Sequence, residues 1–477
     1  MKVLFASAEC VPFFKTGGLG DVAGALPKEL AQRGVELSVV LPFFTKIPIA
    51  FQEQCEEYCD FYVDVGWRHQ YCGIKRLVLK GVTYYFIDNQ YYFDRDNLYG
   101  YEDDSERFAF FSLAIIEMLE KIDWLPDVIH VNDFHSAMVP FLLKEKYQQV
   151  NAYRSIKTIL TIHNIEFQGA YDKNVLPDFF DIGLERFDDG SIRLGDSINY
   201  LKAGIVYADR VNTVSPTYAN EIQTPEFGFG LDEILRLEQE KLSGILNGID
   251  VELYDPQTDE QIPMNFSVHD LSGKMQDKQV LQEKMNLPIR QDIPLIGVVS
   301  RLTVQKGFRL LLDELTNILE NEVQIVLLGT GDPEIEESFR QFSNRYPDQF
   351  RANILFDVSL AQLIYAGADL FLMPSAAEPC GLSQMIAMRY GAVPIVHGVG
   401  GLKDTVLPFD PETKAGTGFV FSAFTSDALL STISRAITMY QSERVIWTDV
   451  MNQGMTKDFS WEKSAKIYLE LYKRALD

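Results

Sequence analysis

Short apolar runs of the kind found in buried strands recur along the chain and alternate with longer amphipathic segments. In the first half they begin at 3–8 and end at 242–250, and a second series begins at Leu295. Apolar runs that alternate with helical patterns are typical of parallel sheets covered by helices on both faces. The pattern therefore predicts an α/β protein with two doubly wound sheets, joined by a polar, loop-rich hinge at 251–291.

Two segments depart from this alternation. Residues 51–101 contain aromatic runs in which buried and exposed positions alternate, which is typical of antiparallel strands, so we expect a β-rich insertion there. Residues 456–477 form an amphipathic pattern, and we expect a terminal helix that packs back on the first domain. The predicted domains are thus 1–250 and 251–455, followed by this helix.

Composition and charge exclude several classes of partner. The formal net charge of −25 argues against nucleic acid, because such partners need a basic surface. No apolar run reaches the length of a membrane span, and the first residues lack the features of a secretion signal. The five scattered cysteines suggest neither a disulfide framework nor a zinc site. We expect a cytoplasmic protein with neither membrane nor nucleic-acid partners, and the oligomeric state is left open.

A glycine-rich turn, Lys15-Thr-Gly-Gly-Leu-Gly-Asp-Val, connects the first predicted strand to the first helix. Gly17 and Gly18 would let a ligand approach the backbone closely, and Asp21 is suited to cap the helix. The spacing differs from the dinucleotide-binding fingerprint, so no such site is predicted. The alternative is a tight turn that binds no ligand.

Polar residues stand at the carboxyl ends of two predicted strands in the first half. Asp133 follows the run at 127–131, and His163 and Asn164 follow the run at 157–162. Open α/β sheets bind their ligands at this end of the strands. The sequence therefore predicts a ligand site there, with a structural role for the histidine as the alternative.

The segment from 91 to 101 is rich in aromatic residues, which suit either packing or stacking on sugar rings. It also contains Asp94-Arg95-Asp96, a D-x-D triplet of the kind that metal-dependent sugar transferases use, although a plain polar loop is the alternative. We predict no metal site here and keep Tyr99 as a candidate substrate contact. The aromatic members are Tyr91, Tyr92, Phe93, Tyr99 and Tyr101.

The second half places two cations on one strand-to-helix turn. Arg301 offers a fork of donors and Lys306 a point charge, a combination that suits a diphosphate, with a pair of surface cations as the alternative. Farther along, Glu378 precedes a small-residue turn where a helix begins, so that free backbone amides are expected beside it. Together with Lys15, these groups predict one sugar-nucleotide site that closes between the two domains.

Six motifs occur in order along the chain: Lys15-TGGLGDV, Thr161-IHNIEFQG, Leu246-NGID, Ser300-RLTVQKG, Leu328-GTGD and Glu378-PCGLSQMIAMRYG. Together they resemble the bacterial glycogen synthase and starch synthase family. The resemblance implies a GT-B fold, in which two Rossmann-like domains face each other across a cleft. It also implies retaining transfer of glucose from ADP-glucose to the non-reducing end of an α-1,4-glucan, without a cofactor or an obligatory metal.

The same resemblance implies roles for the residues that match the family's motifs. Glu378 matches the essential carboxylate, and Arg301 and Lys306 match the diphosphate clamp. Asp133 and His163 match polar residues near the glucose and the acceptor, and these five are the expected catalytic residues. The expected substrate-binding residues are Lys15, Gly17, Gly18, Asp21, Tyr99, Asn164, Asn247, Cys380, Gly381, Leu382 and Ser383.

The chain departs from the family pattern beside the key carboxylate. Ala376 and Ala377 stand where the family usually has arginine and phenylalanine. Ile386 occupies the position of the second glutamate in the broader E-x7-E pattern, so the sequence offers no partner carboxylate for a double displacement, and we favour a front-face route. Two alternatives stay open: a transferase with another nucleotide sugar or acceptor, and a glucan-binding paralogue without turnover.

Overall fold

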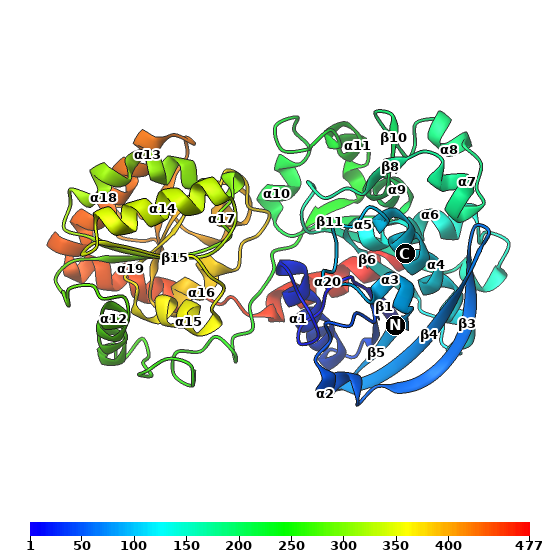
Figure 1. The fold of residues 1–477 in the computed structure, drawn as a ribbon, viewed down its shortest axis with the longest axis horizontal. Helices are drawn as coiled ribbons and strands as arrows, with labels where there is room; N and C mark the ends of the chain where they lie inside the picture. The colour runs from blue at the N-terminus through cyan, green and yellow to red at the C-terminus, as the bar shows by residue number, and fades with distance from the viewer. The chain divides into compact units, whose positions relative to one another are not determined.

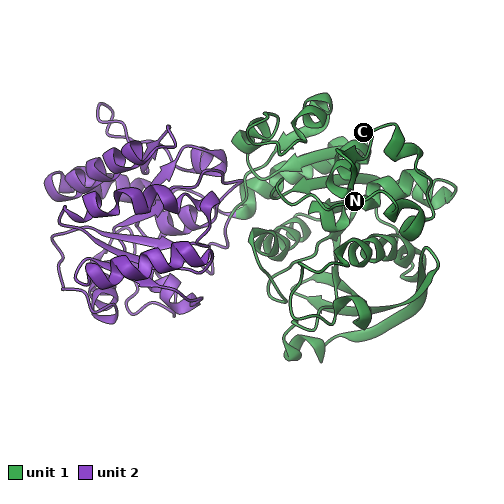
Figure 2. Ribbon diagram, turned by 45° about the horizontal axis from the view of Figure 1, so that its top comes forward, with its two compact units in different colours: residues 1–248, 461–477 green, residues 249–460 purple.

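The computed structural model describes residues 1–477, which divide into two compact units (Figure 1). Unit 1 comprises Met1–Gly248 and Trp461–Asp477, and unit 2 comprises Ile249–Ser460 (Figure 2). The chain therefore leaves unit 1 once, builds unit 2 completely, and returns so that both termini belong to unit 1. The first crossing lies after Gly248, close to the division expected after residue 250.

A nine-stranded sheet forms the centre of unit 1, with the strand order β12-β11-β7-β6-β1-β2-β5-β4-β3. Neighbouring strands are parallel from β12 to β5 and antiparallel from β5 to β3. Val3, Leu4 and Phe5 of β1 are all fully buried, as expected for a strand covered on both faces. The strands are β1 (Lys2–Ala6), β2 (Glu36–Pro42), β3 (Glu56–Val65), β4 (Arg68–Leu79), β5 (Val82–Asp88), β6 (Val128–Asn132), β7 (Lys157–Ile162), β11 (Arg210–Thr213) and β12 (Leu242–Gly244).

Helices and a small second sheet surround this core. Helix α4 is deeply embedded, since its run 108–116 is entirely buried. No helix of the chain combines the length and apolar content that crossing a membrane requires. The remaining elements of unit 1 are α1 (Gly18–Gln32), α2 (Ile49–Gln52), α3 (Gln90–Phe93), α4 (Asp104–Lys121), α5 (Asp133–Ser136), α6 (Met138–Glu145), β8 (Ala170–Asp172), α7 (Val175–Phe180), α8 (Glu185–Asp188), β9 (Arg193–Leu194), β10 (Ser197–Asn199), α9 (Tyr200–Tyr207), α10 (Pro216–Glu221), α11 (Asp232–Leu237) and α20 (Trp461–Leu476).

The β-rich segment expected as an insertion is instead an extension of the main sheet. Strand β5 pairs in parallel with β2, and β4 and then β3 add to it in antiparallel fashion. The aromatic residues that follow mostly pack inward: Tyr92 and Phe93 are fully buried, while Tyr91 is 64% exposed. Most of these rings therefore contribute to the core.

Unit 2 contains a six-stranded, wholly parallel sheet with the order β15-β14-β13-β16-β17-β18. The order reverses between β13 and β16, which is where doubly wound sheets bind ligands at the strands' carboxyl ends. The elements are α12 (Ser272–Lys284), β13 (Leu295–Val299), α13 (Phe308–Leu319), β14 (Gln324–Leu328), α14 (Pro333–Arg345), β15 (Phe350–Asn353), α15 (Val358–Gly367), β16 (Leu370–Met373), α16 (Ser383–Arg389), β17 (Val393–His397), α17 (Gly400–Thr405), β18 (Phe419–Phe421), α18 (Ser426–Ser442) and α19 (Arg444–Thr456).

The stretch expected as a polar hinge contains helix α12, which belongs to unit 2. Its inward face is polar: Lys274 is buried and its Nζ donates to the carbonyls of Ala366, Ala368 and Tyr390 at 2.7–2.8 Å. These carbonyls terminate other elements, so the lysine acts as a cap from outside those helices. The expectation of a loop-rich segment was wrong at 272–284, because the buried face of this helix is polar and resembles exposed positions in a sequence.

The terminal helix begins later than expected. Helix α19 ends at Thr456, and α20 begins only at Trp461, after a turn in which the carboxylate of Asp458 accepts from the amide of Ser460 at 2.9 Å. Helix α20, drawn in red, lies among the strands and helices of unit 1 (Figure 1). The hydroxyl of Tyr472 lies 2.8 Å from Nδ1 of the fully buried His130 on β6, which ties the helix to the sheet.

Candidate active site

The glycine-rich turn of unit 1 is organised by a carboxylate that the sequence analysis overlooked. Glu9 follows β1 and is only 4% exposed. Its Oε2 accepts from the amides of Thr16 and Gly17 at 2.7 and 3.0 Å, and its Oε1 accepts from the Thr16 hydroxyl at 2.6 Å. A buried carboxylate with several donors fixes the backbone around it. The available signal was its position directly after a buried strand, the same position that singled out Asp133.

This turn displays Lys15 to solvent beside a carboxylate. The Lys15 Nζ lies 2.8 Å from Asp21 Oδ1, and burial raises the pKa of Asp21 despite this neighbouring cation. Helix α1 begins at Gly18 and has Gly17 as its N-cap without a side-chain capping bond, so the predicted capping role of Asp21 was wrong. The surface over Gly17 and Gly18 is open, because a Cβ atom at either would meet nothing within 4 Å.

The structure brings Asp133 and His163 together at the ends of β6 and β7. Asp133 has a φ of +54°, which is uncommon for a residue with a side chain, and strained backbone of this kind is concentrated at functional sites. Its Oδ1 accepts from the backbone amide of His163 at 2.7 Å. Burial raises the pKa of Asp133 to about 7, even though the amides of His163 and Asn164 lower it.

The hydrogen bonds of His163 define its tautomer. Asn132 donates through Nδ2 to the carbonyl of Ala6 at 2.9 Å, which leaves its Oδ1 as the acceptor 2.9 Å from His163 Nε2. The Nε2 atom of His163 therefore carries the proton, and Nδ1 keeps its lone pair. Burial lowers the pKa of His163 to about 3, so this imidazole is neutral and cannot act as a cation at ordinary pH.

The other candidate residues of unit 1 differ in whether their side chains already have hydrogen-bond partners. The hydroxyl of Tyr99 donates to Glu9 Oε1 at 2.8 Å, so this ring supports the glycine-rich turn. The Oδ1 atom of Asn164 accepts from the amide of Glu166 at 3.0 Å, which closes a tight turn after β7. Asn247 is buried, and its Oδ1 has no hydrogen-bond partner. An orphaned buried acceptor is costly and marks Asn247 as a group available to a ligand.

The D-x-D triplet has the environment of a structural loop. Arg95, its central residue, makes a bidentate contact with Asp103 at 2.8 and 3.0 Å and donates to the carbonyl of Tyr91. The structure contains no group of three or more His, Cys, Asp or Glu side chains placed to hold a metal ion. The triplet thus belongs to an internal ion pair that orders the loop.

In unit 2, Glu378 and Lys306 form a close pair. Lys306 Nζ donates to Glu378 Oε2 at 2.6 Å, and the hydroxyl of Ser375 donates to the same oxygen at 3.0 Å. The side chains are 17% and 9% exposed, so water screens this pair only in part. Ser375 is held in turn by His397, whose Nδ1 lies 2.7 Å from its carbonyl. A buried carboxylate and a less buried ammonium group thus occupy the sheet end together.

Glycines allow the loops of this site to approach one another closely. Gly400 has a φ of +45°, and a Cβ atom there would lie 1.8 Å from the carbonyl oxygen of Glu378. Gly307, which follows Lys306, has a φ of +78°, and its Cβ would lie 1.9 Å from the carbonyl of Pro374. No other residue fits either position, so these glycines place Lys306 against the loop that carries Glu378.

The remaining unit 2 candidates line the rim of the same sheet end. Arg301 is exposed directly after β13 and makes no ion pair, so its guanidinium is available to an anion. Helix α16 begins at Ser383, and the first amides of a helix have no intrahelical acceptor. Cys380 is buried, whereas Gly381, Leu382 and Ser383 are half-buried at this helix start.

The two alanines beside Glu378 have different environments. The amide of Ala376 donates to the carbonyl of Gln305 at 2.8 Å, which joins the Glu378 loop to the turn that carries Lys306. This bond uses only backbone atoms, so it tolerates the loss of the arginine usual in the family. Nothing in the structure explains alanine at 377.

Two Rossmann-like units, each with polar residues at the carboxyl ends of parallel strands, are the architecture of glycosyltransferases of the GT-B class. Residues 2–237 match the starch synthase catalytic domain, and residues 293–439 match the glycosyl transferases of group 1. A glycogen synthase of Lactococcus lactis subsp. lactis is 59% identical with 99% of each chain covered, and one of Streptococcus equi subsp. equi is 56% identical with 100% of each covered. The chain belongs to the glycogen synthase and starch synthase family.

Solved structures agree with this assignment. The catalytic domain of starch synthase IV from Arabidopsis thaliana, bound to ADP and acarbose, superposes with a TM-score of 0.91 at 33% identity, covering 100% of this chain and 99% of that one. A sucrose-phosphate synthase from Thermosynechococcus elongatus shares the fold at a TM-score of 0.61 and 18% identity, over 99% and 98% of the two chains. The prediction of a GT-B fold is confirmed, and the chain is a glycosyltransferase.

Proposed function

We propose that this enzyme transfers glucose from ADP-glucose to the non-reducing end of an α-1,4-glucan, with retention of configuration and release of ADP. The observation that carries the proposal is the Lys306–Glu378 pair at the end of the unit 2 sheet, with the unpaired Arg301 on the same turn. The related starch synthase structure bound to ADP and acarbose supports a nucleotide diphosphate and an oligosaccharide-like ligand for this family.

In this proposal the cations stabilise the leaving group. Charge builds on the diphosphate as the glycosidic bond breaks, and fixed positive groups stabilise that charge most strongly where water is scarce. Arg301 would contact the phosphates through its fork of N–H groups, and Lys306 would add a point charge. Because the ion pair with Glu378 also holds Lys306, the ammonium group of Lys306 is already in position before the substrate binds.

The surroundings of Glu378 favour a fixed negative charge over a nucleophile. Its Oε2 already accepts from Lys306 and Ser375, and both bonds reduce the nucleophilicity of that oxygen. We propose that Glu378 supports the positive charge of an oxocarbenium-like transition state, and that the departing diphosphate accepts the acceptor's proton in a front-face reaction. A glycosyl–enzyme trapped on Glu378 would contradict this mechanism.

Unit 1 would contribute neutral polar groups to the sugar and the acceptor. A neutral His163 with its Nδ1 lone pair can accept from a glucose hydroxyl, and Asp133 can exchange a proton near neutral pH. The orphaned acceptor of Asn247 could be satisfied by a hydroxyl as well. Lys15 and the open surface over Gly18 suit a phosphate or a sugar, depending on the ligand.

We further propose that catalysis needs no metal ion, since side-chain cations supply the charge that a metal would otherwise provide. The five cysteines are free thiols, and we propose a cytoplasmic location, where a reducing environment keeps thiols free.

A chelator tests the proposal that catalysis needs no metal ion. Full activity after treatment with the chelator would support it. Loss of activity that returns only with a divalent cation would contradict it.

The experiment that tests the function compares donors. The protein is incubated with glycogen and either ADP-glucose or UDP-glucose, and release of the nucleoside diphosphate is measured together with chain extension. ADP release with extension is the expected result. Preference for UDP-glucose would reassign the donor, and glycogen binding without release from either donor would indicate a paralogue without turnover.

A further inference from the structure

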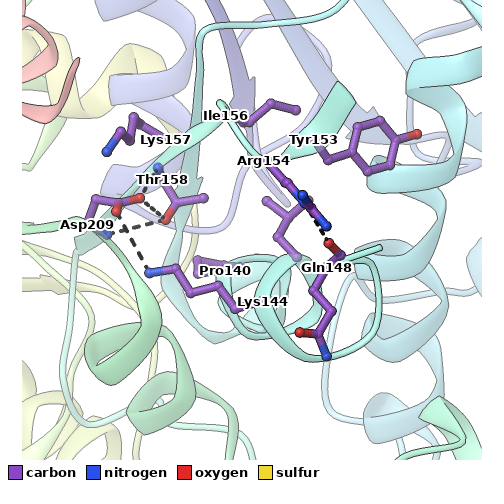
Figure 3. Close-up of a pocket in the computed structure, with 10 residues that line it drawn as sticks. Pro140, Lys144, Gln148, Tyr153, Arg154, Ile156, Lys157, Thr158 and Asp209 are labelled. Atoms are coloured by element: carbon purple, nitrogen blue, oxygen red, sulfur yellow. Dashed lines mark hydrogen bonds and ion pairs between the residues drawn. The ribbon is translucent and has the colours of Figure 1, made fainter. Parts of the chain in front are cut away.

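One hollow of unit 1, with a volume of about 420 Å³, opens at the amino ends of β7 and β11 (Figure 3). Its polar side chains do not converge: Arg154 and Gln148 lie on one side of it, and Lys157 and Asp209 lie on the other. Asp209 is also engaged already, because its Oδ2 accepts from the amide of Thr158 at 2.8 Å. The hollow therefore does not present one set of polar groups to a ligand.

The polar groups around the Glu378 turn do converge, and they converge on Gln384. This glutamine is fully buried near the start of α16. Its Nε2 donates to the backbone carbonyls of Cys380 and Gly381 at 3.0 and 2.9 Å. Since carbonyl oxygens only accept hydrogen bonds, the nitrogen of the side-chain amide, and not its oxygen, must face the turn.

These two bonds determine the direction of two backbone amides. In a planar trans peptide, the C=O and N–H groups point in opposite directions. The carbonyl of Cys380 shares its peptide with the amide of Gly381, and the carbonyl of Gly381 shares its peptide with the amide of Leu382. Both amides therefore point away from Gln384. Neither donates to an acceptor of the protein, and both residues are half-buried, so the two N–H groups are available to a ligand.

The turn is shaped to fit the glutamine. Gly381 has a φ of +75°, and a Cβ atom there would lie 2.5 Å from Oε1 of Gln384 and 3.0 Å from its Nε2. A side chain at 381 would thus displace the amide that orients the turn. The buried Oε1 atom has no hydrogen-bond partner, so every hydrogen bond of this side chain is made by Nε2.

The same nitrogen connects the turn to α17. It lies 3.0 Å from Oγ1 of Thr405, whose hydroxyl donates to the carbonyl of Gly401 at 2.6 Å. Because the hydroxyl proton is used in that bond, the Thr405 oxygen accepts from Gln384. The amide of Gly401 donates to the carbonyl of Glu378 at 3.0 Å. One connected network therefore holds the turn both at residue 378 and at residues 380–381.

The oriented amides belong to the turn that also carries the charged pair of the candidate site. Glu378 Oε2 accepts from Lys306 Nζ at 2.6 Å. Negative charge that develops beside such a pair is stabilised most by N–H groups that are already oriented, because they need not turn during the reaction. Amides whose direction is fixed by buried hydrogen bonds meet this requirement.

We propose that Gln384 is a positioning residue for glucosyl transfer, which orients the amides of Gly381 and Leu382 toward the departing diphosphate. Gln384 is fully buried and acts only through the backbone of the turn. This role rests on the proposed function, since it requires a leaving group that gains negative charge at the Glu378 turn.

Two substitutions test the role, with kcat measured as ADP release at saturating ADP-glucose and glycogen. Gln384→Glu replaces the NH₂ group by oxygen, which repels the two carbonyls, and Gln384→Met keeps the length of the side chain without any donor. Both should lower kcat by about tenfold or more, since small displacements from reacting geometry have effects of that size. The KM for glycogen should stay close to that of the unchanged enzyme.

The pH profile separates positioning from a general loss of stability. A buried carboxyl group that faces only oxygen acceptors takes up a proton readily, and it can then donate one hydrogen bond. The kcat of Gln384→Glu, relative to the unchanged enzyme, should therefore rise between about pH 8 and about pH 6. Gln384→Met has no proton to gain and should show a constant relative kcat over this interval.

The matched control is Gln282→Glu on α12. Gln282 is also fully buried, its Nε2 donates to the carbonyl of Arg290 and to Gln324, and its Oε1 has no partner. Gln324 is the first residue of β14, at the end of the sheet opposite the candidate site. The control should lose stability in urea and keep its kcat, and circular dichroism shows whether each variant is folded.

The outcomes distinguish this role from the proposed function. Normal kcat in a folded Gln384→Glu or Gln384→Met enzyme would overturn the positioning role alone. A loss in Gln384→Glu that is no larger than the loss in Gln282→Glu, or that does not recover at lower pH, would also overturn it. Absence of ADP release from the unchanged enzyme would instead contradict the proposed function itself.

Discussion

Lys306 and Glu378 depend on each other because each is the other's closest charged neighbour, at 2.6 Å. Replacing Lys306 with alanine removes a cation from the expected diphosphate site and leaves Glu378 bonded only to Ser375. Loss of one preorganised group that stabilises transition-state charge typically lowers kcat by about 100- to 1,000-fold. We expect Lys306→Ala to fall in this range, measured as ADP release at saturating substrate.

The control for this substitution is Lys466→Ala, which removes an equal charge from the exposed surface of α20. Its kcat should match that of the unchanged enzyme. A Lys306→Ala enzyme that keeps most of its kcat but has a raised KM would show that the lysine binds substrate without stabilising the departing diphosphate. That outcome would remove Lys306 from the catalytic residues.

The raised pKa of Asp133 predicts how the stability of the protein depends on pH. Its pKa is about 7 in the folded protein and close to 3.8 when unfolded, so between these values the folded state keeps a proton that the unfolded state has lost. The free energy of unfolding therefore falls as pH rises from about 4 to about 7. Asp133→Asn removes this titration, and its stability relative to the unchanged protein should improve over that interval by up to about 4 kcal/mol.

Urea unfolding at about pH 4 and about pH 8 measures this difference. The asparagine Oδ1 can still accept from the amide of His163, so the local hydrogen bond is retained. Asp196→Asn, in an exposed turn, serves as the surface control. A constant difference between Asp133→Asn and the unchanged protein at both pH values would contradict the raised pKa.

At the residue scale, functional candidates could be identified from the sequence where a polar residue directly follows an apolar run. Side chains that act through a hydrogen-bond network could not be identified in this way. The sequence identified Asp133 and His163 because polar residues directly after an apolar run are visible without a structure. It missed the role of Glu9, whose carboxylate accepts four hydrogen bonds from residues 16, 17 and 99, and partners that distant are joined only by folding. It also gave Asp21 a capping role that the backbone of Gly17 makes unnecessary.

At the scale of elements, the first residues of α17 set the position of the Glu378 loop. The amide of Gly401 donates to the carbonyl of Glu378 at 3.0 Å, and a Cβ atom at 401 would lie 2.0 Å from the carbonyl oxygen of Cys380. Alanine at 401 must therefore push the loop away. We expect Gly401→Ala to lower kcat by about tenfold or more, since a displacement of about 1 Å from reacting geometry has effects of that size.

The matched control is Gly454→Ala in helix α19, where the new Cβ would lie 3.3 Å from the flexible side chain of Met388. That change should leave kcat unaltered and affect thermal stability only slightly, because alanine favours the helix. Circular dichroism shows whether each variant keeps its secondary structure. A fully active Gly401→Ala enzyme would mean that the loop position has little influence on the reaction.

Elements were predictable where their buried face is apolar. The parallel strands of both sheets follow from their apolar runs, and so does the alternation with helices. Helix α12 was not predicted, because polar residues on its buried face resemble solvent-exposed positions in a sequence. These residues are Lys274, Asp277, Lys278 and Gln282. Apolar residues can mislead in the opposite direction: Leu355 and Phe356 follow the end of β15 at Asn353, and both are exposed.

At the scale of the whole molecule, the chain closes unit 1 with its last helix. Helix α20 places Tyr468 and Tyr472 in the centre of unit 1, where their hydroxyls meet the side chains of Asn212 and His130. His130 Nε2 also lies 2.7 Å from the hydroxyl of Thr161, so the network joins α20 to three neighbouring strands. Unit 1 thus stays incomplete until unit 2 has been synthesised, which is a consequence of the chain order and not of any contact between the units.

This topology predicts which unit a change in α20 destabilises. Tyr472→Phe leaves Nδ1 of the fully buried His130 without a partner, at a cost of about 1–3 kcal/mol. Hydrogen exchange followed by mass spectrometry should show faster exchange in β1, β6 and β7 and unchanged exchange in the strands of unit 2. Lys473→Ala, which removes only a surface ion pair with Glu470, should change neither. Equal acceleration in both units would mean that the chain unfolds as a single cooperative body, and that the final helix stabilises more than the unit it completes.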